Sequence, residues 1–257
     1  MSFTVENLEF YLMIIVRMSA FVYSAPFFSL SNVPVKVKAG FAVFLGLMMA
    51  NMLDYTPLSY SGTIGFAILV IKEAIVGLLI GYSANICSYI VGFAGQMIDM
   101  DIGLSMVNVL DPVAKVQTTI TGNLYSYFVM FLLMATNMHY FILSAIFDSF
   151  TLIPIGKAVI HPSMYEIMVQ YVVDYFVIGF RIVLPIFATT LLLNIVLGIM
   201  AKVAPQMNMF VIGMQLKIIV GFVVLLLIIE MMPQVSDFIF TEMKTMMNLA
   251  IRAMAPK

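Results

Sequence analysis

Hydrophobic residues gather in six long runs along the 257 residues, and each run carries few charges. A helix needs about 20 apolar residues, at about 1.5 Å per residue, to cross the hydrocarbon of a bilayer. The runs cover roughly 8–28, 39–53, 64–95, 120–147, 167–201 and 207–232. Short connections between them favour hairpins. The pattern therefore predicts an all-α integral membrane protein of about six hydrophobic helices.

Not every run has the length of a straight crossing. The run 167–201 has 35 residues, which would make a helix of about 52 Å against about 30 Å of hydrocarbon. Such a helix must tilt, break or leave the membrane plane, and Pro185 is the expected break. The run 64–95 is also too long and 39–53 is short, so partly broken or tilted helices are expected.

Two connections contain residues typical of irregular backbone. The connection 96–119 includes Gly103 and the pair Asp111-Pro112, and the connection 148–166 includes Pro154, Gly156 and Pro162. Irregular backbone at membrane depth survives only when it is buried in protein or lines a watery cavity. We therefore expect the loop 96–119 to turn inward and to line such a space.

Small residues recur at helical spacing through the third run. They are Gly77, Gly81, Ala84, Ser88, Gly92 and Gly95. A mean spacing of about 3.6 places them on one face of a continuous helix, where another helix can approach closely. The partner is either a helix of the same chain or a different subunit, and the sequence does not separate these alternatives.

The last residues predict an amphipathic helix. Between Phe238 and Met254, apolar side chains recur at helical spacing, at Ile239, Met243, Met246, Ala250 and Met254. Such a helix packs its apolar face on a partner or a membrane interface.

Composition agrees with a membrane protein and excludes several other classes. Apolar residues make up 63% and charged residues 10%, with a mean hydropathy of +1.10, unlike a soluble domain. A net charge of −1 gives no basic surface for nucleic acid. The single cysteine, Cys87, excludes an internal disulfide. Most of the 24 methionines are expected to fill gaps, while Met97, Met100 and Met106 are candidates for a deformable constriction.

Charged residues inside the runs need a physical reason, because each costs about 2.5–3.5 kcal/mol on insertion scales. They are Arg17, Lys72, Glu73, Asp174, Arg181, Lys217 and Glu230. Asp174 and Arg181 are seven apart on one face, which predicts an ion pair or a shared cavity. Lys72, Glu73 and Glu230 are expected to extend to an interface. For Arg17 and Lys217 a buried partner, a lipid headgroup and a transport role all stay open.

Catalytic motifs are missing from the sequence. His139 and His161 belong to no H-E-x-x-H pattern, and Gly156-Lys157 lacks the rest of a phosphate loop. Asp99 and Asp101 have no neighbouring base or metal ligands, so a solvated or hydrogen-bonded turn is favoured over a carboxylate site. The sequence therefore predicts no enzyme, no cofactor and no metal.

Several short blocks resemble a known family. They are Pro26-Phe27-Phe28-Ser29, Val33-Pro34, Lys38-Ala39, Ala94 to Asp99, Gly103-Leu104-Ser105, Asp111-Pro112, Asn137-Met138-His139, Ser149-Phe150 with Pro154, Pro205 to Phe210, and Lys217-Ile218. In this order, over most of the chain, they resemble the FliR family of flagellar type III export-gate proteins. Asp101 stands where that family usually has glutamine, Met138 where it has glycine, and Gln215 where proline is common.

The resemblance implies a core subunit of the flagellar protein export gate. Such a subunit would form the protein-conducting channel with FliP and FliQ homologues, next to the FlhB switch protein. It would lie in the bacterial inner membrane, in the flagellar basal body, in contact with lipid. Residues 1–180, with the inward loop 96–119, would be the FliP-like part. Residues 181–257 would be a FliQ-like hairpin with an amphipathic tail, and the assembly would be a helical hetero-oligomeric cone of bent hairpins.

The resemblance also implies a plug that closes the channel. The matching positions are about 103–119, and the candidate plug residues are Gly103, Leu104, Met106, Val107, Val109, Leu110, Asp111 and Pro112. Their apolar side chains would exclude water and ions and then yield to unfolded flagellar substrates, since hydrophobic constrictions gate by dewetting.

Other classes stay open at this point. The charges inside the runs and the long fifth run are compatible with a secondary transporter of a small solute or ion, although no inverted repeat is evident. A gate subunit of a virulence injectisome and a scaffold that nucleates the ring are further alternatives. For the export-gate subunit, the small-residue stripe is expected to serve subunit packing, and Arg17, Asp174, Arg181 and Lys217 are expected to be buried charges.

Overall fold

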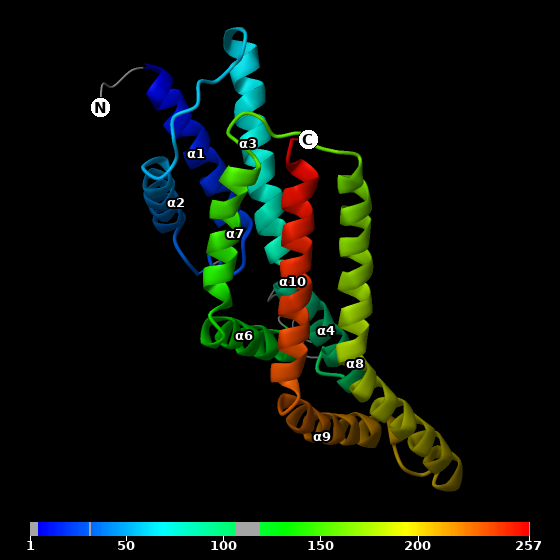
Figure 1. Ribbon diagram of the computed structural model, residues 1–257. Helices are drawn as coiled ribbons and strands as arrows, with labels where there is room; N and C mark the ends of the chain where they lie inside the picture. Colours follow the sequence, from blue (N-terminus) through cyan, green and yellow to red (C-terminus); the bar gives the residue numbers. More distant parts are fainter. Residues whose placement is uncertain (1–4, 31, 106–118, 257) are drawn as a thin grey trace. The chain divides into compact units, whose positions relative to one another are not determined.

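Every regular element in the described part of the chain is an α-helix. The computed structural model describes residues 5–30, 32–105 and 119–256 (Figure 1). The helices are α1 Val5–Ser24, α2 Val35–Ala50, α3 Gly62–Ala84, α4 Ile86–Ile102, α6 Ile120–Ala135, α7 Met138–Leu152, α8 Ser163–Val203, α9 Met209–Ile229 and α10 Met232–Met254. The all-α fold predicted from the sequence is confirmed.

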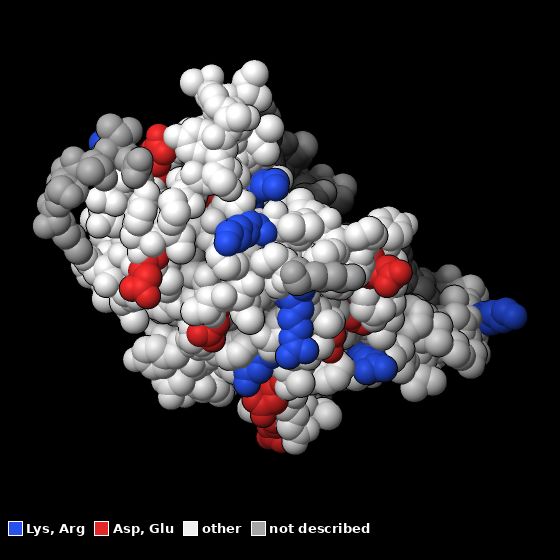
Figure 2. All heavy atoms as spheres, turned by 45° about the horizontal axis from the view of Figure 1, so that its top comes forward, with Lys and Arg blue, Asp and Glu red and all other residues white. Residues whose placement is uncertain are grey.

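Several helices can cross a bilayer. By length and apolar composition these are α3, α8 and α9, and α6 with α7 passes the same test as one broken span. The face in Figure 2 is mostly white, with Lys, Arg, Asp and Glu side chains in small separate groups. Exposed apolar residues continue along these helices, including Ile68, Leu192 and Leu226. The chain is a membrane protein.

The chain divides into two compact units. The first contains 1–87, 136–172 and 240–257, and the second contains 88–135 and 173–239. In the first unit α1 packs against both α2 and α3, and α3 also touches α7. Met13, Ile14, Met18 and Phe21 of α1 are fully buried and form much of that core.

The third hydrophobic run is two helices, not one. α3 ends at Ala84 and α4 begins at Ile86. Between them Asn85 donates its backbone N–H to the carbonyls of Gly81 and Tyr82, and its side chain donates to the Ser24 carbonyl at 3.1 Å. The expectation of one continuous small-residue face is therefore wrong, because an asparagine that bonds to another helix ends the run.

The fourth run also contains two helices. α6 ends at Ala135 and α7 begins at Met138, with Asn137 in the left-handed region at φ 59°. Asparagine adopts this conformation more readily than most residues, because its short amide side chain can bond locally. The connection after α7 is irregular as predicted, and Gly156 has φ +77°.

The fifth run forms one helix of 41 residues, α8, with Pro185 inside it. Figure 1 labels this helix. The predicted break at Pro185 is wrong. Val183 and Ile186, on either side of Pro185, are buried, so packing stabilises the helix before and after the proline. Proline removes one backbone donor, whereas ending a helix in apolar surroundings would leave several groups unsatisfied.

The amphipathic tail is confirmed as part of α10. Its apolar positions are all buried, namely Ile239, Met243, Met246, Ala250 and Met254. Arg252, on the other face, is exposed.

Candidate functional site

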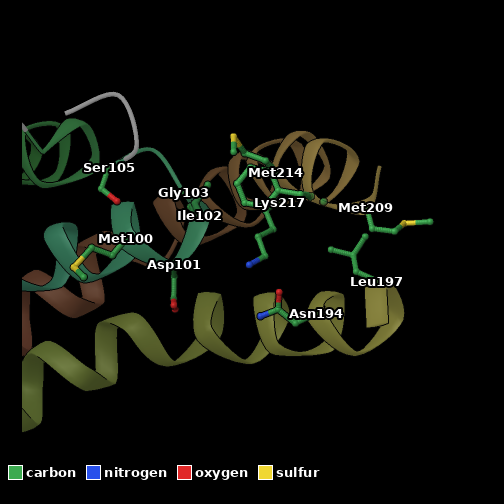
Figure 3. A pocket seen from close by; sticks show the side chains of 12 residues that line it. Met100, Asp101, Ile102, Gly103, Ser105, Asn194, Leu197, Met209, Met214 and Lys217 are labelled. Carbon is green, nitrogen blue, oxygen red and sulfur yellow. The ribbon is translucent and has the colours of Figure 1, made fainter. Parts of the chain in front are cut away.

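A cavity of about 350 Å³ lies in the second unit, where α4 ends next to the predicted plug (Figure 3). Its walls come from the end of α4, from α8 and from the first half of α9. Leu197, Met209 and Met214 make much of the lining apolar. Apolar walls with a few convergent polar groups are typical of a binding site.

The end of α4 is fixed by its own hydrogen bonds. Gly103 has φ +93°, and its N–H donates to the Asp99 carbonyl at 3.1 Å. Helices commonly end with a residue in the left-handed region whose N–H bonds to a carbonyl of the last turn. Glycine adopts this conformation without strain. The Ser105 N–H donates to the same carbonyl at 3.2 Å. Residues 96–102 are therefore helical, and the predicted irregular backbone begins only at Gly103.

Three polar side chains from three helices face the cavity. Asp101 comes from α4, Asn194 from α8 and Lys217 from α9, and Figure 3 shows the Asp101 and Lys217 side chains extending into the space between the helices. One carboxylate oxygen of Asp101 is buried without a hydrogen-bond partner in the described part of the chain. Burial raises the pKa of the Asp101 carboxyl above its ordinary value, and the Lys217 charge lowers it by less.

Asp99 and Asp101 have different surroundings, and they do not form a shared carboxylate site. Asp99 is buried, and both of its carboxylate oxygens accept the Thr121 N–H at 3.2 Å. Asp99 therefore holds the start of α6, as the hydrogen-bonded alternative predicted. The structure brings Asp101 to Lys217 instead, 116 positions along the chain, a distance that local spacing cannot reveal.

Only the beginning of the predicted plug is described. Gly103 and Leu104 lie in the turn after α4. The remaining candidates, Met106, Val107, Val109, Leu110, Asp111 and Pro112, lie outside the described residues.

Arg17 has the buried partner that was one of its open alternatives. Its Nε donates to a Glu73 carboxylate oxygen at 2.6 Å, and both side chains are fully buried. The remaining nitrogens donate to the Ser149 carbonyl at 3.2 Å and to the Ile153 carbonyl at 3.0 Å. The guanidinium also lies 4.3 Å from the centre of the Phe150 ring. This cluster joins α1, α3 and α7 in the first unit.

The expectation that Glu73 extends to an interface is wrong. Its second oxygen accepts the Gly156 N–H at 2.9 Å, so the carboxylate is bonded on both sides. A signal for this pairing was present in the sequence, because Gly77 lies one helical turn from Glu73 on the same face. A Cβ at Gly77 would overlap the Arg17 carbonyl, which shows how closely α1 and α3 approach.

The other members of the small-residue stripe contact different neighbours. A Cβ at Gly81 would meet the Ser24 hydroxyl of α1, and one at Gly95 would meet the Gly122 backbone of α6. Around Gly92 no described atom lies within 4 Å of the added Cβ. Gly77, Gly81 and Gly95 thus pack inside the chain, the first of the two alternatives. Ala84 is buried and Ser88 is half-buried.

Arg181 and Asp174 do not form the predicted ion pair among the described residues. The expectation that Arg181 is a buried charge is wrong, because its side chain is exposed, and its guanidinium lies 5.9 Å from the centre of the Phe238 ring. Asp174 is only half-buried and does not line the hollow next to Arg181. Glu230 is exposed at the end of α9 and Lys72 is half-buried. In the described ranges no three His, Cys, Asp or Glu side chains come together as a metal site.

These features define a class before any comparison. The chain combines several apolar helices, a buried ion pair between Arg17 and Glu73, and a helix-lined cavity, which is typical of a multi-pass α-helical membrane protein.

Comparison with known proteins then gives the family. The chain belongs to the bacterial export proteins, family 1, which match residues 8–243. It is 32% identical to the flagellar biosynthetic protein FliR of Bacillus subtilis over 93% of both chains. It is 26% identical to that of Escherichia coli, over 91% of this chain and 90% of the relative. The protein of the same name in Aquifex aeolicus is 23% identical, over 82% of this chain and 81% of the relative. The resemblance inferred from short blocks is confirmed.

Proposed function

We propose that this protein is a core subunit of the flagellar type III protein export gate, in the bacterial inner membrane. The observation that carries the proposal is the similarity over nearly the full length of both chains to flagellar biosynthetic proteins FliR, within an export family. Its partners would be FliP and FliQ homologues, the FlhB switch protein and unfolded flagellar subunits in transit. Residues 1–180 would be the FliP-like part and 181–257 the FliQ-like hairpin.

The mechanism would be passive gating. Apolar side chains between Leu104 and Leu110 would seal the channel in its closed state and yield to a passing chain. The end of α4 supports this, because Gly103 releases the chain from the helix where the predicted plug begins. The sequence has no phosphate-binding loop, so the driving energy would come from another component.

Deleting residues 106–112 tests the plug. Without the apolar seal, ion leakage across the inner membrane should rise in cells that assemble the gate. A Gly/Ser replacement of the same seven positions is the matched control for length, and it should leak as well. Unchanged leakage and unchanged export in both variants would refute the plug.

A secondary transporter is the competing class, and the cavity with Asp101 and Lys217 is the observation that favours it. Purification in mild detergent separates the two proposals. A transporter would run as a monomer or a small homo-oligomer, whereas a gate subunit would bring down two different small membrane proteins. Motility and hook secretion in a deletion strain would then distinguish a flagellar gate from an injectisome gate or a mere scaffold.

A further inference from the structure

The second half of α8 has the length of one membrane crossing between two cations. From Ile182 to Ala201 the sequence has 20 residues and no charge, and this stretch is bounded by Arg181 and Lys202. At about 1.5 Å per residue it spans about 30 Å, the thickness of bilayer hydrocarbon. A crossing by this stretch would place Arg181 and Lys202 at the two levels where lipid headgroups begin.

Arg181 sits at a hollow in the second unit. The hollow has a volume of about 240 Å³ and is lined by Ile178, Arg181, Ile182, Gln234, Val235 and Phe238. The guanidinium contacts the Phe238 ring but has no hydrogen bond or ion pair to any described residue. Asp174 and Asp237, the nearest acids along α8 and α10, do not line this hollow.

The surroundings of Arg181 on α8 are apolar and exposed. Val177, Phe180 and Leu184 are each 42–56% exposed, so this face meets lipid or protein rather than the core of the unit. A cation beside such a face is costly unless an anion accompanies it. At the level of the headgroups, the phosphate of a phospholipid is the anion that the bilayer itself supplies.

We propose that the Arg181 hollow binds the headgroup phosphate of an anionic phospholipid. The guanidinium fork fits phosphate oxygens in a bidentate manner, and the Gln234 amide supplies a further donor. Ile178, Ile182 and Val235 provide an apolar wall beside the acyl chains. The proposal concerns lipid contact alone and does not depend on the export role.

Lipid retention by the purified full-length protein, with whatever partners co-purify in mild detergent, tests this. Phosphatidylglycerol or phosphatidylcholine is added, and bound lipid is counted by native mass spectrometry. Wild type should retain phosphatidylglycerol in preference to phosphatidylcholine. Arg181→Gln should weaken retention about fivefold, since one cation near a membrane surface contributes roughly that much. Arg181→Lys, which keeps the charge, should retain more than Arg181→Gln, and Arg252→Gln is the matched control.

Several results would overturn the proposal. They are equal retention by wild type and Arg181→Gln, equal retention of both lipids, an equal loss in Arg252→Gln, and full competition by inorganic phosphate at the same concentration. If Arg181→Gln loses partners but each remaining complex keeps its lipid, Arg181 pairs with a neighbouring subunit and the proposal fails. Gln234→Leu leaves the arginine in place and should also reduce retention, which provides a second variant.

Discussion

Arg17 in the first unit and Lys217 in the second are cations inside hydrophobic helices, yet their surroundings differ. Around Arg17, donors and acceptors from three helices and a turn are matched, and Glu73 is bonded through both oxygens. Around Lys217 there is a cavity of about 350 Å³, and the facing Asp101 keeps one buried oxygen without a partner in the described part of the chain.

The difference shows that a charged side chain in an apolar helix can have one of two roles. A fully paired charge fixes how helices pack, because removing one partner leaves the other uncompensated. A charged side chain next to a cavity contributes little to helix packing, and it stays available to water, a ligand or a moving segment. The following variants test this contrast, beginning with the largest expected effect.

Glu73→Ala should be the most damaging change. It leaves Arg17 buried without its counter-ion, which typically costs about 3–5 kcal/mol. We expect a strong fall in the thermal unfolding temperature in detergent and in the amount of folded protein in membranes. Lys72→Ala, next to it and half-buried, is the control.

The double variant Arg17→Met with Glu73→Leu should recover much of that loss, since an apolar pair of similar volume often replaces a buried ion pair. Wild-type stability in Glu73→Ala alone would contradict the structural role of the cluster.

Gly77→Ala should have an intermediate effect. The added Cβ would overlap the Arg17 carbonyl, and α1 and α3 would have to move apart at about 1–3 kcal/mol. Gly92→Ala in α4 is the matched control, because no described atom lies within 4 Å of its Cβ and alanine favours helix. Unfolding temperatures of the two variants in the same detergent provide the measurement, and equal values would show that α1 and α3 have room to adjust.

Asp101→Asn should have the smallest effect, visible mainly as a change in pH dependence. The pKa of Asp101 is raised in the folded state, so the folded protein holds a proton that the unfolded chain releases. Its contribution to stability is therefore present at low pH and is lost as the pH rises through the raised pKa.

Between about pH 4 and pH 7, the thermal unfolding temperature of wild type should fall as the pH rises. In Asp101→Asn this fall should be absent. Lys217→Met removes the charge that lowers the Asp101 pKa, so that pKa should rise further. The fall in unfolding temperature should therefore occur at higher pH than in wild type. Identical profiles for all three proteins would mean that the cavity is open enough for water to screen both groups.

The sequence predicted the helices better than their ends. Hydrophobic runs of membrane length mark α1, α8 and α9 directly, because length and apolar content are local properties. The expected break at Pro185 and the expected continuous helix across Asn85 are both wrong, and for a shared reason. Whether a polar or imino residue breaks a helix depends on partners such as the Ser24 carbonyl, which belong to another part of the chain.

The candidate site was predicted in parts. Lys217, Asp101 and Gly103 were each named from chemistry or resemblance. The shared cavity of Asp101 and Lys217 and the ion pair of Arg17 with Glu73 were not predicted. Both pairs join distant segments, so they depend on how the helices pack and not on local spacing.

The buried face of α10 makes this helix a point of oxidative vulnerability. Met243, Met246, Met247 and Met254 are at most 2% exposed, whereas Met52 and Met100 are 76% and 60% exposed. Conversion of a thioether to a sulfoxide places a polar oxygen among apolar side chains, which disrupts a core. Peroxide would therefore modify the exposed methionines without harm to packing, and reach those of α10 only when the helix lifts away from its core.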